Sequence, residues 1–162
     1  MSQLLERPAV RRVRDALAAA GSAAEVIELT TTARSAEDAA ASVGVELGAI
    51  VKSLVFAAED QAVMALVSGD RRCDTEALAD ALGIAGKIGR ADADQVSDAT
   101  GFTIGGVPPI AHATPMPMAI DAALERFDVI YAAAGHPHCV FATSAEELSR
   151  LTGAPVVAGL GI

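Results

Sequence analysis

The sequence predicts a single α+β domain. Its 162 residues are the usual size of one domain and are enough to enclose a hydrophobic core. Stretches with helical periodicity alternate with short β-rich stretches, and capping or turn residues separate them. No internal repeat, low-complexity tract or linker divides the chain. Residues 1–162 are therefore expected to form one domain, with an N-terminal helix inside residues 1–21.

The N-terminal helix is predicted over residues 8–20. Proline suits the first turn of a helix, and Gly21 is suited to end it. Val10, Val13 and Leu17 fall on one face at helical spacing, so we expect that face to be buried.

Short strands and a hairpin follow. Residues 25–30 are predicted as a strand, and Ser35 as the N-cap of a short alanine-rich helix that ends at Gly44. Residues 50–57 and 62–67 are rich in β-formers and are joined by a short polar segment. These two stretches are predicted to pair as a β-hairpin.

The second half alternates in the same way. Residues 74–82 are predicted as a helix capped by Asp74, and residues 87–90 as a short strand. Asp92 begins a capping box whose helix ends at Gly101. Residues 101–117 are dense in glycine and proline and are predicted to be irregular.

The last part of the chain predicts two strands, a helix and an edge strand. The strands are expected at residues 128–133 and 138–142. A full capping box at Ser144 opens a helix that runs to residue 152, and residues 154–157 could add the edge strand.

Composition and charge exclude several functions. A net charge of −9 argues against broad nucleic-acid binding, including binding to DNA, because phosphate contacts need clustered cations. No apolar run is long enough to cross a bilayer, and the N-terminus lacks the pattern of a signal peptide. The two cysteines, Cys73 and Cys139, fit a reducing compartment. The cytoplasm is the expected location.

Lys52 is the first candidate for chemistry. Alternation along the strand puts Ile50, Lys52 and Leu54 on one face. A lysine on an apolar face needs a partner for its head group or a path to water. It is one of only two lysines, the other being Lys87, among 12 basic residues. It is either a functional cation or a lysine that reaches water at the margin of the sheet.

The second candidate is the glycine-rich stretch at residues 101–109, Gly-Phe-Thr-Ile-Gly-Gly-Val-Pro-Pro. Glycines let the backbone approach a ligand closely, and free N–H groups can hold an oxyanion or phosphate. The stretch lacks the Gly-Lys-Ser/Thr of a P-loop and the strand-loop-helix setting of a dinucleotide site. The alternative is an ordinary rigid turn.

Residues 134–139 bring His136, His138 and Cys139 close in sequence. His112 and Cys73 could add metal ligands, but the spacing matches no standard zinc pattern, so a metal site is disfavoured. His136 is either a polar binding group in a turn or a solvated histidine.

Basic residues gather at two places. Arg7, Arg11 and Arg14 share a helix face, and Arg71 and Arg72 are adjacent. They are candidates for local phosphate contacts, although a solvated surface explains them equally well.

Taken in order, these features resemble the YbaK family, the freestanding relatives of the editing domain inserted in bacterial prolyl-tRNA synthetase. The likeness runs over residues 32–153. It is carried by residues 50–56, 67–72, 100–110, 134–137 and 140–141.

The resemblance implies an α+β fold around a mixed, barrel-like sheet surrounded by short helices. It implies hydrolysis, in trans, of the ester on tRNA mischarged with a small amino acid such as alanine or cysteine, often on tRNA-Pro. The tRNA acceptor end is the implied partner and an aminoacyl-tRNA synthetase a further candidate, with no metal and no organic cofactor.

The resemblance also assigns roles to residues. Lys52, with Gly105 and Gly106, is expected to be catalytic: lysine as a cation that holds the terminal phosphate or ribose, and the glycines as fixed N–H donors to the developing oxyanion. No side-chain base is evident, which suits the use of the tRNA's own 2′-hydroxyl to orient water. The expected substrate-binding residues are Ser53, Gly101, Phe102, Pro108, Gly135, His136 and Pro137, and the candidates for tRNA contact are Arg11, Arg14, Arg71 and Arg72.

Some points stay open at this level. Ser53 stands where the alanine-clearing group tends to have asparagine, which leaves the amino acid undefined. Phe102 and Tyr131 are the nearby candidates for base stacking. A non-catalytic module that binds tRNA ends or a synthetase is the main alternative, and a metal-dependent hydrolase using His136, His138 and Cys139 is a weaker one.

Overall fold

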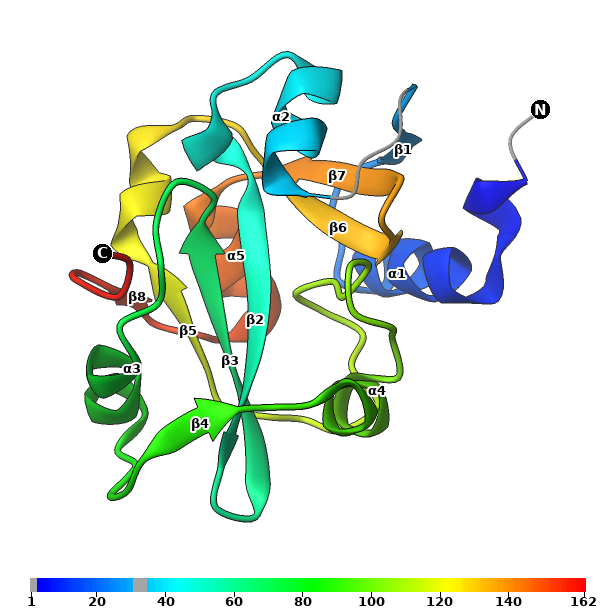
Figure 1. Cartoon of the computed structure of the whole chain (residues 1–162). Coiled ribbons are helices and arrows are strands. Elements are labelled where there is room, and N and C mark those ends of the chain that lie inside the picture. Colours follow the sequence, from blue (N-terminus) through cyan, green and yellow to red (C-terminus); the bar gives the residue numbers. More distant parts are fainter. Residues whose placement is uncertain (1–2, 31–34) are drawn as a thin grey trace.

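Two β-sheets and a set of short helices make up the fold (Figure 1). The structure is a computed structural model, and it describes residues 3–30 and 35–162. The strands are β1 (Val26–Glu28), β2 (Val51–Ala58), β3 (Gln61–Ser68), β4 (Ile88–Arg90), β5 (Met118–Asp121), β6 (Ile130–His136), β7 (Cys139–Thr143) and β8 (Val156–Val157). The helices are α1 (Pro8–Ala19), α2 (Ala36–Val43), α3 (Thr75–Leu82), α4 (Ala93–Thr100) and α5 (Ala145–Thr152), and 3-10 turns lie at Leu4–Glu6, Leu47–Ala49 and Ala122–Arg126.

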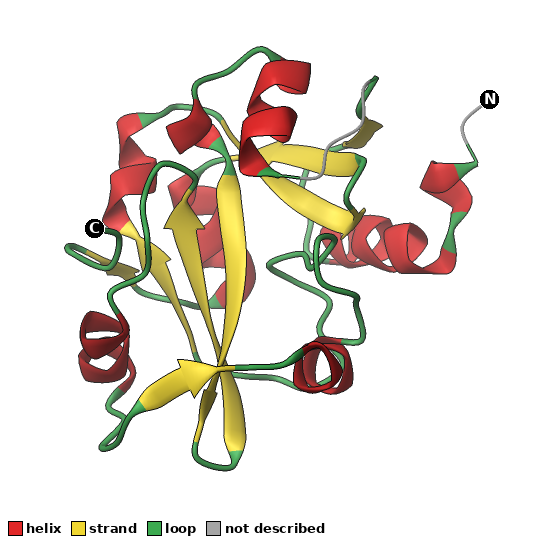
Figure 2. Ribbon diagram, in the orientation of Figure 1, coloured by secondary structure: helices red, strands yellow, loops and turns green. Residues whose placement is uncertain are grey.

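The larger sheet has the strand order β4-β2-β3-β5-β8 and the smaller one β1-β7-β6. β3 pairs antiparallel with β2 and parallel with β5, so the larger sheet is mixed. A parallel bridge between Ile50 and Tyr131 joins the sheets at the start of β2. Figure 2 shows the strands surrounded by helices. The predicted α+β fold with a mixed sheet and short helices is confirmed, with the strands divided between two bridged sheets.

The predicted hairpin forms along its whole length. β2 and β3 pair from Val51 opposite Ser68 to Ala58 opposite Gln61. The connection is a two-residue turn in which Glu59 has a φ of 56°, within the left-handed region. Polar residues in this turn and β-formers on both sides made the hairpin readable from sequence.

Helix ends also follow the sequence. The Ser35 hydroxyl accepts the Asp38 N–H at 3.2 Å. Asp92 and Gln95 form the reciprocal capping box, with both bonds at 2.8 Å. At α5, Ser144 accepts the Glu147 N–H, but the Glu147 carboxylate binds Arg150 instead of the Ser144 N–H, so the full capping box predicted there is only half formed. The helices α2, α3, α4 and α5 end at glycines in the left-handed conformation, namely Gly44, Gly83, Gly101 and Gly153.

The short strand β5 and the 3-10 turn after it were not predicted. β5 has four residues and directly follows the glycine- and proline-rich segment. Its order comes from parallel pairing with the buried strand β3, from Met64 opposite Met118 to Leu66 opposite Ile120. Pairing between distant segments leaves no local pattern in so short a stretch.

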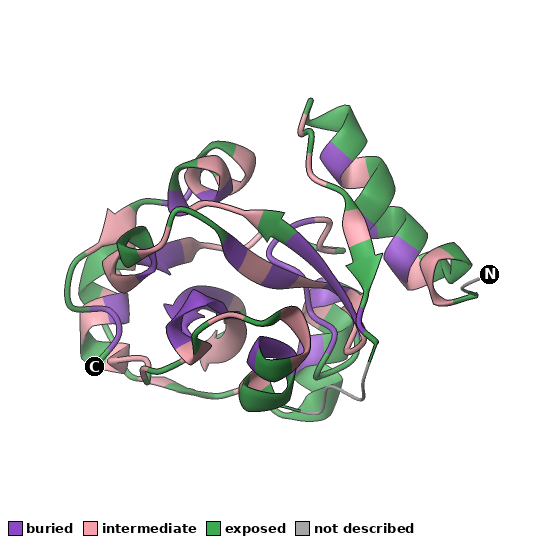
Figure 3. Ribbon diagram, turned by 90° about the horizontal axis from the view of Figure 1, so that it is seen from above, coloured by how far each residue is buried: buried purple, intermediate pink, exposed green. Residues whose placement is uncertain are grey.

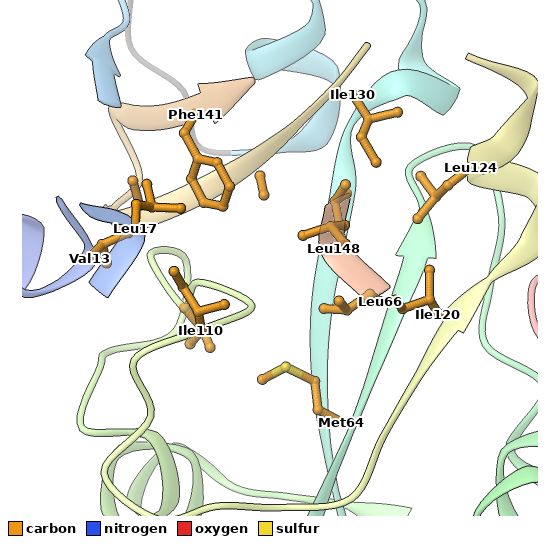
Figure 4. Close-up of a cluster of buried hydrophobic side chains, with 14 of the residues drawn as sticks. Val13, Leu17, Met64, Leu66, Ile110, Ile120, Leu124, Ile130, Phe141 and Leu148 are labelled. Atoms are coloured by element: carbon orange, nitrogen blue, oxygen red, sulfur yellow. The ribbon is translucent and has the colours of Figure 1, made fainter. Parts of the chain in front are cut away.

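The main core lies between the two sheets. Phe141 of β7, Met64 and Leu66 of β3 and Leu148 of α5 meet there (Figure 4), each fully buried. α1 covers one side and, as predicted, buries Val10, Val13 and Leu17. Figure 3 shows α1 with buried patches on one face and exposed residues on the rest.

Candidate functional site

A cavity of about 500 Å³ lies beside β2. Its walls come from residues 50–56 of β2 and the preceding bridge, from α2, from the glycine-rich loop after α4, and from β6, β7 and the turn between them. Lys52, Ser53, Gly105 and Pro137 all line it, as does Tyr131. Residues far apart in sequence that were predicted to act together therefore meet at one cavity.

One wall of this cavity is an unpaired strand edge. β2 pairs with β3 along its full length on one side, but on the other side it pairs with β4 only from Phe56 onward. Before β2, the Ile50 bridge to Tyr131 occupies the same side. Residues 51–55 thus form a gap between two pairings, and the cavity opens onto that gap.

The register shows which backbone groups face the gap. The N–H groups of Met64 and Ser68 in β3 point toward β5, because they donate to Pro117 and Asp121. The odd-numbered residues of β3 therefore face β2, and they lie opposite the even-numbered residues of β2. It follows that Val51, Ser53 and Val55 direct their N–H and C=O groups away from β3, and that those of Ser53 lie in the gap.

Ser53 is the middle residue of this edge. Its side-chain Oγ is buried and has no hydrogen-bond partner among the described residues. Buried hydroxyl groups are normally paired, so an unpaired one in a residue that lines a cavity is a candidate for a ligand contact.

Lys52 lines the same cavity and is half-buried. Its ammonium group donates a hydrogen bond to the carbonyl oxygen of Arg71. Within the described residues, no carboxylate lies within ion-pair distance of it. The ammonium group is thus bound to a neutral acceptor, and no described carboxylate balances its charge, so an anionic ligand could bind there.

The turn that carries the Arg71 carbonyl is fixed by Asp70. Arg126 binds the Asp70 carboxylate through two nitrogens, at 2.8 and 3.2 Å, and also donates to the Ser68 hydroxyl at 2.9 Å. This guanidinium lowers the pKa of Asp70, and the Ser68 hydroxyl adds to the effect. Asp70 is therefore ionised at neutral pH and holds the 68–71 turn against the Ala122–Arg126 segment.

The glycine-rich loop touches the β6–β7 turn. The Gly135 N–H donates to the Gly106 carbonyl at 2.9 Å. A Cβ built on Gly106 would lie 2.8 Å from the His136 nitrogen, so only glycine fits at this approach. The Gly106 N–H is used by the Thr103 carbonyl, at 3.1 Å. The neighbouring Gly105 lines the cavity, and its amide has no partner among the described residues.

Several predicted binding residues lie away from the cavity wall. Phe102 is 2% exposed, and the Arg12 guanidinium covers its ring at 4.7 Å from the centroid. Gly101 ends α4 and packs against the same guanidinium. Pro108 is buried, and its carbonyl bonds to His112 Nε2 at 2.7 Å. These residues support the loop from behind, so Tyr131 is the stacking candidate that reaches the cavity.

His136 also sits behind the wall rather than on it. Its Nδ1 accepts the His138 N–H at 3.1 Å, and the two rings lie 5.2 Å apart. Burial, with the positive fields of His138 and Arg7, lowers the pKa of His136. Its ring is therefore neutral at pH 7 with the proton on Nε2. Pro137, held next to it by the bulge of β6, is the part of this turn that lines the cavity.

The candidate arginines fall into two separate groups. Arg11 and Arg14 are exposed on α1, where Arg14 pairs with Glu6 at 3.4 Å. Arg71 and Arg72 lie in the segment between β3 and α3, and Figure 1 shows α3 and α1 on opposite sides of the molecule. A short acceptor end seated in the cavity would therefore not contact both groups equally.

No group of three or more histidine, cysteine, aspartate or glutamate residues is gathered as a potential metal site within residues 3–30 and 35–162. Cys139 is buried, and burial raises the pKa of its thiol to about 11. In the same described part of the chain, no helix is long and apolar enough to span a membrane.

Two contributors to the site were missed from sequence. Arg12 was not among the candidate arginines, yet it is the residue that covers Phe102. The Asp70–Arg126 pair spans 56 positions, so no local pattern could reveal it. The open edge of β2 could not be predicted from sequence either, because it depends on where the pairing with β4 and the bridge to Tyr131 end.

Comparisons with known proteins agree with this geometry. A family described as the aminoacyl-tRNA editing domain matches residues 30–151. A protein of Bacillus subtilis (strain 168), YwhH, described as uncharacterized, is 30% identical over 129 residues, which are 79% of this chain and 81% of that protein.

Solved structures are similar over nearly the whole chain. One is described as a candidate trans-editing enzyme for prolyl tRNA synthetase; it is 42% identical, with a TM-score of 0.87, covering 94% of this chain and 96% of that one. A second, described as a hypothetical protein, is 27% identical with a TM-score of 0.84, covering 93% of this chain and 99% of that one.

The region matched by the family holds every residue that lines the cavity. It nearly coincides with residues 32–153, over which the sequence was found to resemble the YbaK family. Residues 32–34 of that range lie outside the described residues. The resemblance to the YbaK-like editing proteins is thus confirmed by a family match and by structural neighbours. The chain belongs to the aminoacyl-tRNA editing domain family.

Proposed function

We propose that this protein is a freestanding aminoacyl-tRNA deacylase that acts in the cytoplasm. Its substrate is tRNA mischarged with a small amino acid, of which alanine and cysteine on tRNA-Pro are the first to examine. The observation that carries the proposal is the cavity at which Lys52, Ser53, Gly105 and Pro137 converge within the family-matched region.

The cavity offers two groups for ester hydrolysis. Negative charge develops on the ester carbonyl oxygen in the transition state, and a fixed N–H donor stabilises it. The unpartnered Gly105 amide is that donor, whereas the Gly106 N–H is already used by Thr103. Lys52 binds the terminal phosphate or ribose by exchanging its bond to the Arg71 carbonyl for one to the ligand.

The described lining residues include no aspartate, glutamate or histidine that could act as a general base. The attacking water must then be oriented by another group. The 2′-hydroxyl of the terminal ribose is adjacent to the ester and supplies that group from the substrate itself.

The walls set the class of amino acid. Besides Lys52, Ser53, Ser35 and Tyr131, the side chains around the cavity are apolar, including Val51, Val55, Val96, Val107 and Val140. A charged side chain would be costly to bury there without a partner. Small uncharged side chains are therefore the proposed substrates.

The net charge of −9 is compatible with this activity, because the proposed substrate is held at its acceptor end. Few phosphate contacts are required, so binding should depend only weakly on salt. Arg71, next to the turn that holds Lys52, is the best placed of the candidate arginines, and a synthetase that hands over the tRNA is the further candidate partner.

The test is a panel of mischarged tRNAs incubated with the wild type, K52A and K87A. Lys87 is the other lysine and is exposed, so K87A is a matched control for loss of one positive charge. The wild type and K87A should clear at least one small aminoacyl ester well above the spontaneous rate. K52A should lose about 100-fold or more in kcat/KM, about 2.7 kcal/mol of transition-state stabilisation.

Clearance of no ester by the wild type, with measurable tRNA binding, would favour the non-catalytic module instead. Equal clearance by K52A and the wild type would remove Lys52 from the mechanism.

A further inference from the structure

The open edge of β2 provides a recognition feature that the hydrolytic mechanism does not use. Ser53, at its centre, directs its N–H and C=O into the gap between the Ile50 bridge and the pairing that begins at Phe56. Its buried Oγ has no partner among the described residues. Ser53 lines the cavity, and three of its polar groups have no partner among the described residues.

The substrate brings a group that needs such acceptors. An aminoacyl ester carries a free α-amino group, which titrates near pH 8 in peptides and donates hydrogen bonds in both protonation states. A buried ammonium group must be paired. No carboxylate is among the described residues that line the cavity, and Lys52 has the wrong charge. Uncharged oxygen atoms are the acceptors that remain.

We propose that the Ser53 carbonyl oxygen and Oγ bind the α-amino group of the aminoacyl ester, while the Gly105 amide faces the ester carbonyl. This inference rests on the proposed deacylase function and adds a requirement to it. The protein selects acyl groups with a free α-amino group and rejects tRNA that carries an N-acylated amino acid or a deaminated acid.

This mode of binding fits the open shape of the edge. A strand edge presents acceptors and donors in a fixed row, as in the addition of an extended peptide to a sheet. A single residue with two unpaired oxygen atoms can hold an amino group without contacting the amino-acid side chain. Recognition of the amino group is then independent of which small side chain occupies the apolar part of the cavity.

The experiment compares matched esters on the same tRNA. Alanyl-tRNA-Pro is paired with its propionyl analogue, which has the same shape but lacks the amino group, and with N-acetylalanyl-tRNA-Pro. Cysteinyl-tRNA-Pro is paired with the 3-mercaptopropionyl ester in the same way. Each rate is divided by the spontaneous rate of that ester, because an α-amino group itself speeds hydrolysis.

The expected result is a rate enhancement at least about tenfold greater for the aminoacyl ester than for its deaminated or N-acetylated partner. Equal enhancements for all three esters would overturn the inference while leaving the deacylase function intact. Clearance of none of them would instead count against the deacylase function on which the inference rests.

Two variants assign the effect to Ser53. S53A removes the hydroxyl and should reduce the discrimination between alanyl and propionyl esters severalfold, the carbonyl retaining the rest. Ser42 on α2 also has a buried, unpartnered hydroxyl but is not among the cavity-lining residues, so S42A is the matched control and should discriminate as the wild type does. Unchanged discrimination in S53A would show that another group binds the amino group.

Discussion

At the scale of single residues, Lys52 is defined by the group that holds it. A carboxylate partner would neutralise its charge, whereas the Arg71 carbonyl leaves the charge available. A bond from the ammonium group to a neutral carbonyl is weaker than a bond from it to an anionic phosphate, so a ligand phosphate can replace the carbonyl. The position of that carbonyl therefore determines where the Lys52 ammonium group lies.

Asp70 is predicted to position Lys52 through this turn. In D70N the bidentate bond to Arg126 weakens, and the carbonyl of Arg71 is less firmly placed. The ion pair is well exposed, so the loss in unfolding free energy should be below about 1 kcal/mol. Activity should fall further, by about tenfold in kcat/KM, mainly through a higher KM because Lys52 is the proposed substrate-binding cation.

The control is E147Q, which weakens the exposed Arg150–Glu147 pair on α5. Urea unfolding and deacylation kinetics of both variants separate the two roles. If D70N lost no more activity than E147Q, the pair would be a structural contact only.

The individual site residues differ in how far sequence could identify them. Lys52 stood out because a lysine on an apolar strand face is unusual and the chain has only two lysines. Phe102 and Pro108 belong to the same motif as Gly105, yet they are buried behind the loop. A motif fixes which residues are neighbours along the chain. Which of them face the cavity depends on the path of the backbone, and that is decided by contacts with α1 and β6.

At the scale of elements, the glycine-rich loop is held from three directions. The Gly135 N–H bonds to the Gly106 carbonyl, His112 bonds to the Pro108 carbonyl, and Arg12 of α1 covers Phe102. Two of these attachments come from α1 and β6, and the third comes from His112, later in the same irregular segment. The loop is therefore preorganised, which an oxyanion donor requires.

G106A is predicted to disturb this loop. The new Cβ would lie 2.8 Å from the His136 nitrogen and 2.9 Å from the Gly135 carbonyl carbon, and both are backbone atoms that move together with β6. We expect a loss of about 1–3 kcal/mol in unfolding free energy, typical of overpacking. Because Gly105 is the adjacent residue, deacylation by the folded protein should also fall.

G89A is the matched control for this change. Gly89 lies in the exposed strand β4, and a Cβ there meets no atom within 4 Å. Its unfolding free energy, measured by urea titration, should stay within about 0.5 kcal/mol of the wild type. A G106A protein as stable and active as G89A would show that the loop can shift without cost.

Elements defined by local signals were predictable, and those defined by distant partners were not. The β2–β3 hairpin and the caps at Ser35, Asp92 and Ser144 rest on residues a few positions apart. β5 becomes a strand only because β3 lies beside it. The open edge of β2 also depends on distant partners. It lies between the bridge of Ile50 to Tyr131 and the pairing with β4 that begins at Phe56.

At the scale of the whole molecule, two half-buried histidines link stability to pH. Burial is the main cause that lowers the pKa of His112 below its ordinary value of 6.5, and burial also lowers that of His136. The unfolded chain therefore binds protons more readily than the folded one. The stabilisation is fully present above the unfolded pKa near 6.5 and is lost as pH falls through the lower folded values.

A second, opposite effect comes from the net charge of −9. Acidification reduces self-repulsion among the carboxylates and stabilises the compact state. The two effects separate when variants are compared with the wild type, because replacing one histidine leaves the carboxylates unchanged. H112Q should lose less unfolding free energy than the wild type between pH 7.5 and 5.5, and H112Q/H136Q less still.

Urea titrations followed by circular dichroism measure the unfolding free energy of each variant at each pH; circular dichroism is used because the chain has no tryptophan. Asp70 and Glu147 do not interfere in that window, because Arg126 and Arg150 lower the pKa of their respective carboxyls from ordinary values of 3.8 and 4.5. A wild-type pH dependence identical to that of H112Q/H136Q would mean that the histidines titrate alike in both states.

Because His112 bonds to the glycine-rich loop and His136 adjoins the cavity-lining Pro137, the same protonations should loosen the site, and deacylation should fall over the pH range in which stability is lost.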